Sequence, residues 1–92
     1  MANKRKLKKQ IKYVTSELFA ECICASTYST RADRDENLKA LLWRVVALNN
    51  DYLNRVSHPE PGLAPKNYYH VLINSFNKDI NEVVDLIGNM LN

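Results

Sequence analysis

The sequence contains few of the residues that turn, break or cross-link a chain. Its 92 residues include two glycines, three prolines and two cysteines. So few turn-forming residues argue against an all-β fold with many tight turns, and two cysteines are too few for the disulfide framework of a small secreted domain. No stretch reaches the roughly 18–20 apolar residues that a membrane-spanning helix needs. We therefore expect a cytoplasmic protein with no membrane partner.

The composition otherwise fits one globular domain that comprises residues 1–92. Hydrophobic residues make up 46% and charged residues 25% of the chain, a balance that is typical of folded domains and not of disordered chains. The basic start does not continue as a signal peptide, because Lys12, Glu17 and Glu21 interrupt the apolar run that should follow it.

Three segments have the spacing of an amphipathic helix, with apolar residues recurring every three or four positions. We predict helices over about 6–28, 34–56 and 66–90. In the first helix the apolar face comprises Leu7, Ile11, Val14, Leu18, Cys22 and Ala25. In the second it comprises Leu38, Leu41, Leu42, Val45, Leu48, Tyr52, Leu53 and Val56. In the third it comprises Tyr69, Leu72, Ile73, Phe76, Ile80, Val83, Val84, Ile87 and Met90.

Two polar connections separate these helices. Asp33, followed by Glu36, predicts a capping box in which the Asp33 carboxylate accepts a backbone N–H of the first turn. The stretch from Ser57 to Pro65 is rich in helix breakers, and Pro65 suits the first turn of the third helix. Short connections make successive helices antiparallel. The predicted fold is therefore an all-α, up-down-up three-helix bundle.

Two variants of this bundle stay open. A break near Glu21 would divide the first helix, and the loop at 57–65 can fold into a short extra turn. The cations at the start of the chain are poorly suited to a helix N-terminus, because the positive end of the helix dipole repels them. We therefore expect residues 1–6 to form a frayed basic arm.

The chain carries more apolar side chains than one face of each helix can bury. Phe19 and Ile23 lie about 100° or more from the core line of the first helix, and Trp43 lies about 140° from the core centre of the second, one turn before Ala47. A helix that is apolar around most of its circumference needs cover on more than one side. Phe19, Ile23, Trp43 and Ala47 therefore predict an interaction surface, covered by a second copy in a homodimer or by a partner helix. Alternatively, Trp43 lies flat against the bundle, partly covered by Lys39.

Asn49 falls close to the middle of the apolar face of the second helix. A buried amide needs a hydrogen-bonding partner, and such a pair can fix the register of two helices. Asn49 either finds this partner inside the bundle or lies at the edge of the core and reaches water.

Positive charge is concentrated at the N-terminal end of the chain. The net charge is +3, with 13 basic and 10 acidic residues. The first twelve residues contain no acid and six cations, Lys4, Arg5, Lys6, Lys8, Lys9 and Lys12. Such a cluster can neutralise the phosphates of nucleic acid, although no aromatic residue before Tyr13 offers a platform for stacking bases. A nucleic-acid-associated accessory protein is therefore the alternative function, and a solvated chain end is the simpler interpretation.

No set of residues predicts catalysis or a metal site. Cys22 and Cys24 lie two positions apart on a helix and point in nearly opposite directions, so they cannot share a metal, and we expect two buried thiols. His58, Glu60 and His70 gather near the second loop, but no nucleophile or phosphate-binding loop accompanies them. We predict a non-enzymatic protein–protein interaction or self-association module without cofactor or metal. A ligand site at His58, Glu60 and His70 is the weaker alternative.

A resemblance accompanies these patterns. The stretch Arg55-Val56-Ser57-His58-Pro59-Glu60-Pro61-Gly62, followed by Tyr68-Tyr69 and Phe76-Asn77-Lys78, resembles a group of short uncharacterised bacterial helical-bundle proteins. The resemblance would cover most of the chain. It implies an all-helical fold in a bacterial cytoplasm, and it implies no activity and no site residues.

Overall fold

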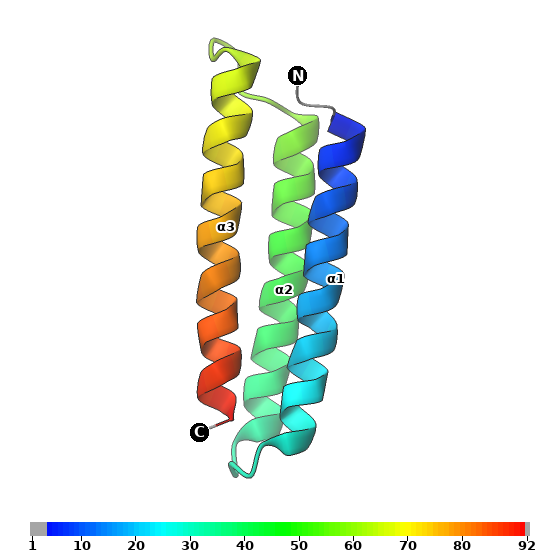
Figure 1. Ribbon diagram of the computed structural model, residues 1–92, viewed down its shortest axis with the longest axis vertical. Helices are drawn as coiled ribbons and strands as arrows, with labels where there is room; N and C mark the ends of the chain where they lie inside the picture. Colours follow the sequence, from blue (N-terminus) through cyan, green and yellow to red (C-terminus); the bar gives the residue numbers. More distant parts are fainter. Residues whose placement is uncertain (1–3, 92) are drawn as a thin grey trace.

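The chain folds into three antiparallel helices that form one long bundle. The computed structural model describes residues 4–91, with α1 at Lys4–Tyr28, α2 at Arg34–Ser57 and α3 at Pro65–Met90. The helices run down, up and down in Figure 1, and the bundle measures 49 × 18 × 16 Å. Residues 4–91 contain no strand. The predicted all-α three-helix bundle is confirmed.

The helix boundaries follow the buried residues. α1 begins at Lys4, two residues before the predicted boundary, because Leu7 and Ile11 are buried in its first turns and anchor it to the other helices. Residues 4–6 are helical and residues 1–3 of the expected basic arm lie outside the described residues, so the fraying of that arm stays a prediction. α1 continues through Glu21 without a break, and residues 58–64 contain no further helix.

The connection between α2 and α3 turns at Gly62. Its φ of 94° lies in the left-handed region that glycine adopts without steric cost. Pro65 occupies the first turn of α3 as predicted, where its missing N–H removes no helical hydrogen bond.

The predicted capping box at the start of α2 is wrong. Asp33 precedes the helix, but its side chain accepts no capping hydrogen bond from a backbone N–H of the first turn. Its carboxylate oxygens instead accept hydrogen bonds from the Arg31 guanidinium at 3.0 and 3.3 Å. The φ of −95° and ψ of 14° at Asp33 differ from the extended conformation of a side-chain cap. The hydrogen bond from Arg31 also lowers the pKa of Asp33, because it favours the ionised carboxylate.

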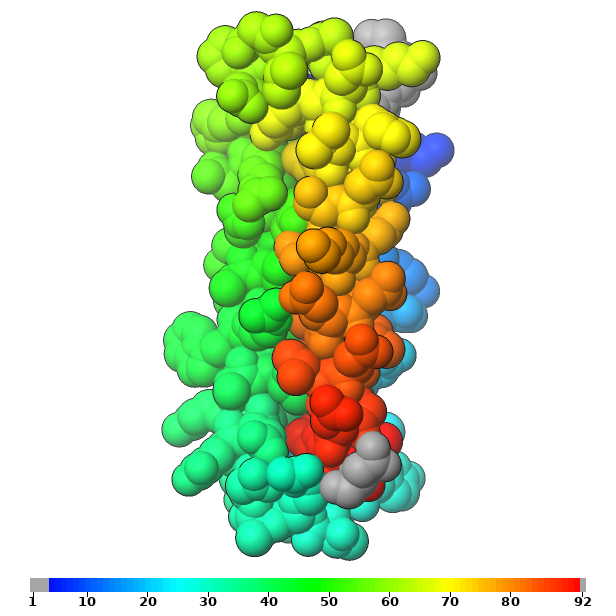
Figure 2. Space-filling view, turned by 90° about the vertical axis from the view of Figure 1, so that its left-hand side faces the viewer, coloured from blue at the N-terminus to red at the C-terminus, as the bar shows by residue number. Residues whose placement is uncertain are grey.

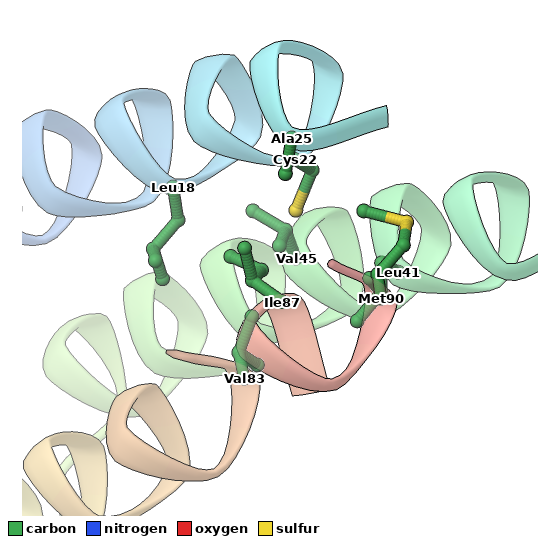
Figure 3. Close-up of a cluster of buried hydrophobic side chains, with 8 residues drawn as sticks. All are labelled: Leu18, Cys22, Ala25, Leu41, Val45, Val83, Ile87 and Met90. Atoms are coloured by element: carbon green, nitrogen blue, oxygen red, sulfur yellow. The ribbon is translucent and has the colours of Figure 1, made fainter. Parts of the chain in front are cut away.

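Two clusters of buried side chains fill the bundle. The cluster nearer the α1–α2 connection draws on all three helices (Figure 3) and comprises Leu18, Cys22, Ala25, Leu41, Val45, Val83, Ile87 and Met90. The cluster nearer the α2–α3 connection comprises Leu7, Ile11, Tyr52, Val56, Tyr69, Leu72 and Phe76. Leu48 and Ile80 pack against both clusters and join them into one core.

Most of the predicted core positions are buried, while Leu38, Leu42, Leu48 and Leu53 on α2 and Ile80 on α3 are half-buried. Thr15 is buried where Val14, which we assigned to the core, is only half-buried. Ile73 and Val84 were expected in the core of α3 and are exposed. The physical reason is that α3 makes its least extensive contact with α1. Ile73 accordingly lines a shallow depression between these two helices instead of a closed interface.

A buried phenol connects α2 to α3 near the middle of the bundle. Tyr52 is 1% exposed and its hydroxyl donates a hydrogen bond to Asp79 Oδ2 at 2.5 Å. Its ring meets the Phe76 ring edge to face, with the centroids 5.1 Å apart. Burial, followed by the hydrogen bond and the charge of Asp79, raises the pKa of Tyr52 to about 12, because all three effects disfavour the phenolate.

Both ends of α3 are held by hydrogen bonds to the rest of the bundle. At its start, the Tyr68 and Tyr69 hydroxyls donate to the carbonyl oxygens of Arg55 and Val56 at 3.0 and 3.3 Å. At its end, the Ser29 hydroxyl donates to the Met90 carbonyl at 2.7 Å. The last carbonyls of a helix lack intrahelical partners, so the loop at Ser29 satisfies one of them.

Replacement of Ser29 by alanine is expected to lower the free energy of unfolding by about 1–2 kcal/mol, because the buried Met90 carbonyl loses its donor. Thr30→Ala, at an exposed neighbouring position, is the matched control and should change the stability by less than about 0.5 kcal/mol. Urea denaturation followed by circular dichroism measures both values. Equal stabilities of the two variants would contradict the role assigned to Ser29.

In the part of the chain that the structure describes, none of the three helices combines the length and the apolar character that crossing a membrane requires.

Figure 2 views the bundle from the α3 side, with α3 across the front, α2 on one flank and part of α1 on the other. The most extensive helix contact is between α1 and α2. The outer side of this helix pair is where the predicted interaction residues gather.

Candidate interaction surface

The three large apolar residues of the predicted interaction surface are exposed. Phe19 and Ile23 on α1 are 37% and 44% exposed, and Trp43 on α2 is 70% exposed. They lie outside the core because the buried face of α1 runs through Leu18 and Cys22, whose neighbours in sequence point to the flank of the helix. These residues are therefore available for contact, as the helical spacing predicted.

Phe19 and Trp43 come together across the α1–α2 contact. With three residues of α2, namely Lys39, Leu42 and Val46, they line a shallow apolar depression of about 240 Å³. Trp43 is thus neither buried nor alone, since it forms one wall of a hollow that Phe19 closes from the neighbouring helix. The alternative, that Trp43 lies flat against the bundle, does not fit an exposure of 70%.

A second depression continues the first one along the same helix pair. It has a volume of about 430 Å³ and is lined by Lys12, Thr15, Ser16, Phe19, Val45, Val46 and Asn49. Because Phe19 and Val46 line both hollows, they form one continuous feature. We call the two together the α1–α2 groove. The described residues of α3 contribute nothing to its lining.

The floor of the groove contains a hydrogen bond between the two helices. The Thr15 hydroxyl donates to Asn49 Oδ1 at 2.8 Å, and its oxygen also lies 3.0 Å from the Ile11 carbonyl oxygen. Asn49 is half-buried, so it has a protein partner and also borders the groove. This polar contact fixes the register of α1 against α2 in a way that apolar contacts alone do not.

The sequence predicted part of the groove and missed the rest. Ile23 and Ala47 are exposed but line neither depression, and Ala47 points further round α2 than Trp43 does. Leu42 and Val46 were missed as parts of the surface. Helical spacing carried no signal for them, because only the pairing of Thr15 with Asn49 shows that residues 42 and 46 of α2 lie level with the segment of α1 that contains Phe19.

The basic cluster forms part of a folded helix. Arg5, Lys6, Lys8, Lys9 and Lys12 line a hollow of about 490 Å³ on the first turns of α1, and Lys4 is exposed at the start of the helix. Arg5, Lys8, Lys9 and Lys12 follow the i, i+3, i+4, i+7 spacing of one helix face. Lys12 belongs both to this hollow and to the α1–α2 groove, so the two features are contiguous.

The two cysteines occupy different environments. Cys22 is fully buried, and burial is the main cause that raises the pKa of its thiol. Cys24 is exposed, which corrects the expectation that both thiols are buried. The physical reason is their spacing of two residues, which places them on opposite sides of α1.

The residues of the weaker ligand-site alternative do not converge. His58, Glu60 and His70 are all exposed, and His58 Nδ1 lies 3.1 Å from the Asn54 carbonyl oxygen at the end of α2. Within residues 4–91 no group of three or more histidine, cysteine, aspartate or glutamate side chains could hold a metal ion. His58 therefore belongs to the end of α2, where its backbone N–H also donates to the Asn54 carbonyl oxygen.

No protein-family model, no curated protein and no solved structure matches the chain. The resemblance to bacterial helical-bundle proteins therefore stays a prediction. A function has to be inferred from the groove and the charges around it.

Proposed function

We propose that the protein is a non-enzymatic helical module for protein–protein association and that the α1–α2 groove is its docking surface. The observation that carries this proposal is that Phe19 and Trp43, from two different helices, line one apolar depression. Single exposed apolar residues are ordinary on protein surfaces, whereas contiguous apolar hollows with aromatic walls are typical of binding sites. The occupant is a second copy of the chain, which gives a homodimer, or a helix of a partner protein.

We also propose a cytoplasmic, bacterial setting for this association. Cys22 and Cys24 are free thiols, which is the ordinary state of cysteine in a reducing compartment. The bacterial origin rests on the sequence resemblance alone.

The test compares the wild-type chain with Phe19→Asp and with Val71→Asp, which places the same charge at an exposed position of α3. Sedimentation velocity from low to high micromolar concentration detects a homodimer, which Phe19→Asp should dissociate and Val71→Asp should not. Selection from a displayed library of amphipathic helices detects a partner helix, and the affinity of selected helices should fall at least tenfold with Phe19→Asp only. Circular dichroism checks that both variants keep their helices.

One combination of results contradicts the proposal. It is a wild-type chain that stays monomeric at high concentration and selects no helix whose binding depends on Phe19. Binding that Val71→Asp weakens as much as Phe19→Asp would also place the docking surface elsewhere.

Nucleic-acid association is the second candidate function. The observation in its favour is the hollow lined by five basic side chains from one end of α1. Phosphate contacts by such side chains supply affinity that does not depend on base sequence and falls steeply with salt. Among the described residues of this cluster none is aromatic, so it offers phosphate contacts without a stacking surface.

A further inference from the structure

The α1–α2 groove has a defined length. Thr15 opposes Asn49 across the antiparallel pair, so Lys39, ten residues before Asn49, lies level with about residue 25 of α1. Lys12 and Lys39 line the two ends of the groove. They are therefore about 13 residues apart along the axis, or about 20 Å at 1.5 Å per residue. A helix of about four turns spans this distance.

The groove has one sign of charge. Lys12 and Lys39 border its two ends, and among the described residues no acidic side chain lines either depression. Positive charge continues past Lys12 onto the hollow that Arg5, Lys8 and Lys9 line. The apolar middle at Phe19, with cations at both ends, is the complement of an apolar stripe between acidic residues.

A second copy fits this charge pattern poorly. Groove-to-groove pairing about a two-fold axis places the same surface on both subunits. Lys12 and Lys39 of one copy would then face cations of the other copy across the contact. Like charges placed opposite one another in this way oppose association, so the surface favours an occupant of opposite charge.

Nucleic acid fits the groove less well than a helix does. Phosphates can pair with Lys12 and the basic hollow, but they leave the aliphatic side chains of Leu42 and Val46 uncovered. An amphipathic helix covers these residues with its own apolar side chains, because its i, i+3, i+4, i+7 stripe matches a groove between two helices.

We propose that the α1–α2 groove binds an acidic amphipathic helix of another protein, with acidic residues near both of its ends that pair with Lys12 and Lys39. This inference rests on the proposed function, since it names the partner class of the same groove. The apolar middle supplies the contact area, and the cations orient the helix and speed its encounter.

The test uses two helix-stapled synthetic peptides of about 16 residues and no tryptophan. Both carry the same leucine stripe, one with glutamates and the other with lysines at its flanks. The chain has one tryptophan, so the emission of Trp43 reports occupation of the groove directly. The acidic peptide should shift this emission to shorter wavelength and saturate, and the basic peptide should bind at least tenfold more weakly.

Charge variants then test the two lysines. Lys12→Ala combined with Lys39→Ala should weaken the acidic peptide about tenfold and flatten the salt dependence of its binding. Lys66→Ala combined with Lys78→Ala removes two exposed lysines from α3 and is the matched control, which should bind the acidic peptide as the wild type does.

Each remaining outcome overturns this inference, and the first two leave the proposed function standing. Equal binding of both peptides, lost in Phe19→Asp, leaves the docking groove and refutes its preference for acidic helices. Unchanged binding in the Lys12→Ala, Lys39→Ala variant refutes the assigned pairing. A twenty-nucleotide oligo-dT that displaces the acidic peptide and binds more tightly assigns the surface to nucleic acid. Absence of any peptide binding, with a monomeric chain, refutes both proposals.

Discussion

Tyr52→Ala is expected to lower the free energy of unfolding by about 3–5 kcal/mol, the usual cost of removing a buried aromatic side chain. The ring of Tyr52 lies in the core cluster with Val56 and Phe76. Its loss leaves a cavity there, removes the edge-to-face contact with Phe76 and leaves Asp79 without its phenolic donor. Since small domains are stable by only about 5–15 kcal/mol, a large part of the total stability would be lost. Urea denaturation followed by circular dichroism measures the change.

The matched control for this variant is Tyr13→Ala. Tyr13 is a tyrosine in the middle of α1 that is 65% exposed, so its removal should change the stability by no more than about 0.5 kcal/mol. A loss below about 1 kcal/mol for Tyr52→Ala, or similar losses for both variants, would contradict the packing described for Tyr52.

The bundle is expected to lose stability steeply above about pH 10, because Tyr52 keeps its proton in the folded chain up to a pKa of about 12. In the unfolded chain the phenol ionises near pH 10. Below that pH both states are protonated and the contribution of Tyr52 is complete. Between about pH 10 and 12 the unfolded state binds fewer protons, so the free energy of unfolding falls by up to about 2–3 kcal/mol.

Comparison with Tyr52→Phe isolates this contribution from lysines and other tyrosines that titrate in the same range. At about pH 9 the wild type should be the more stable protein, because it keeps the hydrogen bond to Asp79. The stability difference should shrink as the pH rises to about 11.5, when urea midpoints are compared at each pH. A stability difference between the wild type and Tyr52→Phe that stays constant over this range would contradict the raised pKa of Tyr52 in the folded chain.

The fold could be predicted from the sequence because each helix carries a clear apolar stripe and few residues interrupt it. Val14 and Thr15 show the limit of this approach. Both lie beside the core line of α1, and hydropathy alone favours valine. Thr15 is nevertheless buried, because its hydroxyl donates to Asn49 Oδ1, and a polar group that is hydrogen-bonded can be buried at little cost.

The candidate site could be predicted only in part, because helical spacing places residues on one helix and does not relate one helix to another. Phe19, Ile23 and Trp43 were identified from their angles to the core. Leu42 was assigned to the core and Val46 to neither the core nor the surface, and only the register of α1 against α2 brings them into the groove with Phe19. The prediction that Asp33 caps α2 was wrong for a related reason, because helix-capping patterns do not show which other side chain reaches the carboxylate. The carboxylate of Asp33 pairs with Arg31 instead.

The order of the helices has a consequence for how the chain reaches its native state. Each helix packs most extensively on one that is adjacent in sequence, and α1 and α3, the pair distant in sequence, make the least contact. Native contacts in such a topology join residues that are close in sequence. The contact order is therefore low, and a low contact order goes with fast folding. Helical bundles of this kind fold in microseconds to milliseconds, so we expect the docking groove, whose described lining comes from α1 and α2 alone, to form on that timescale.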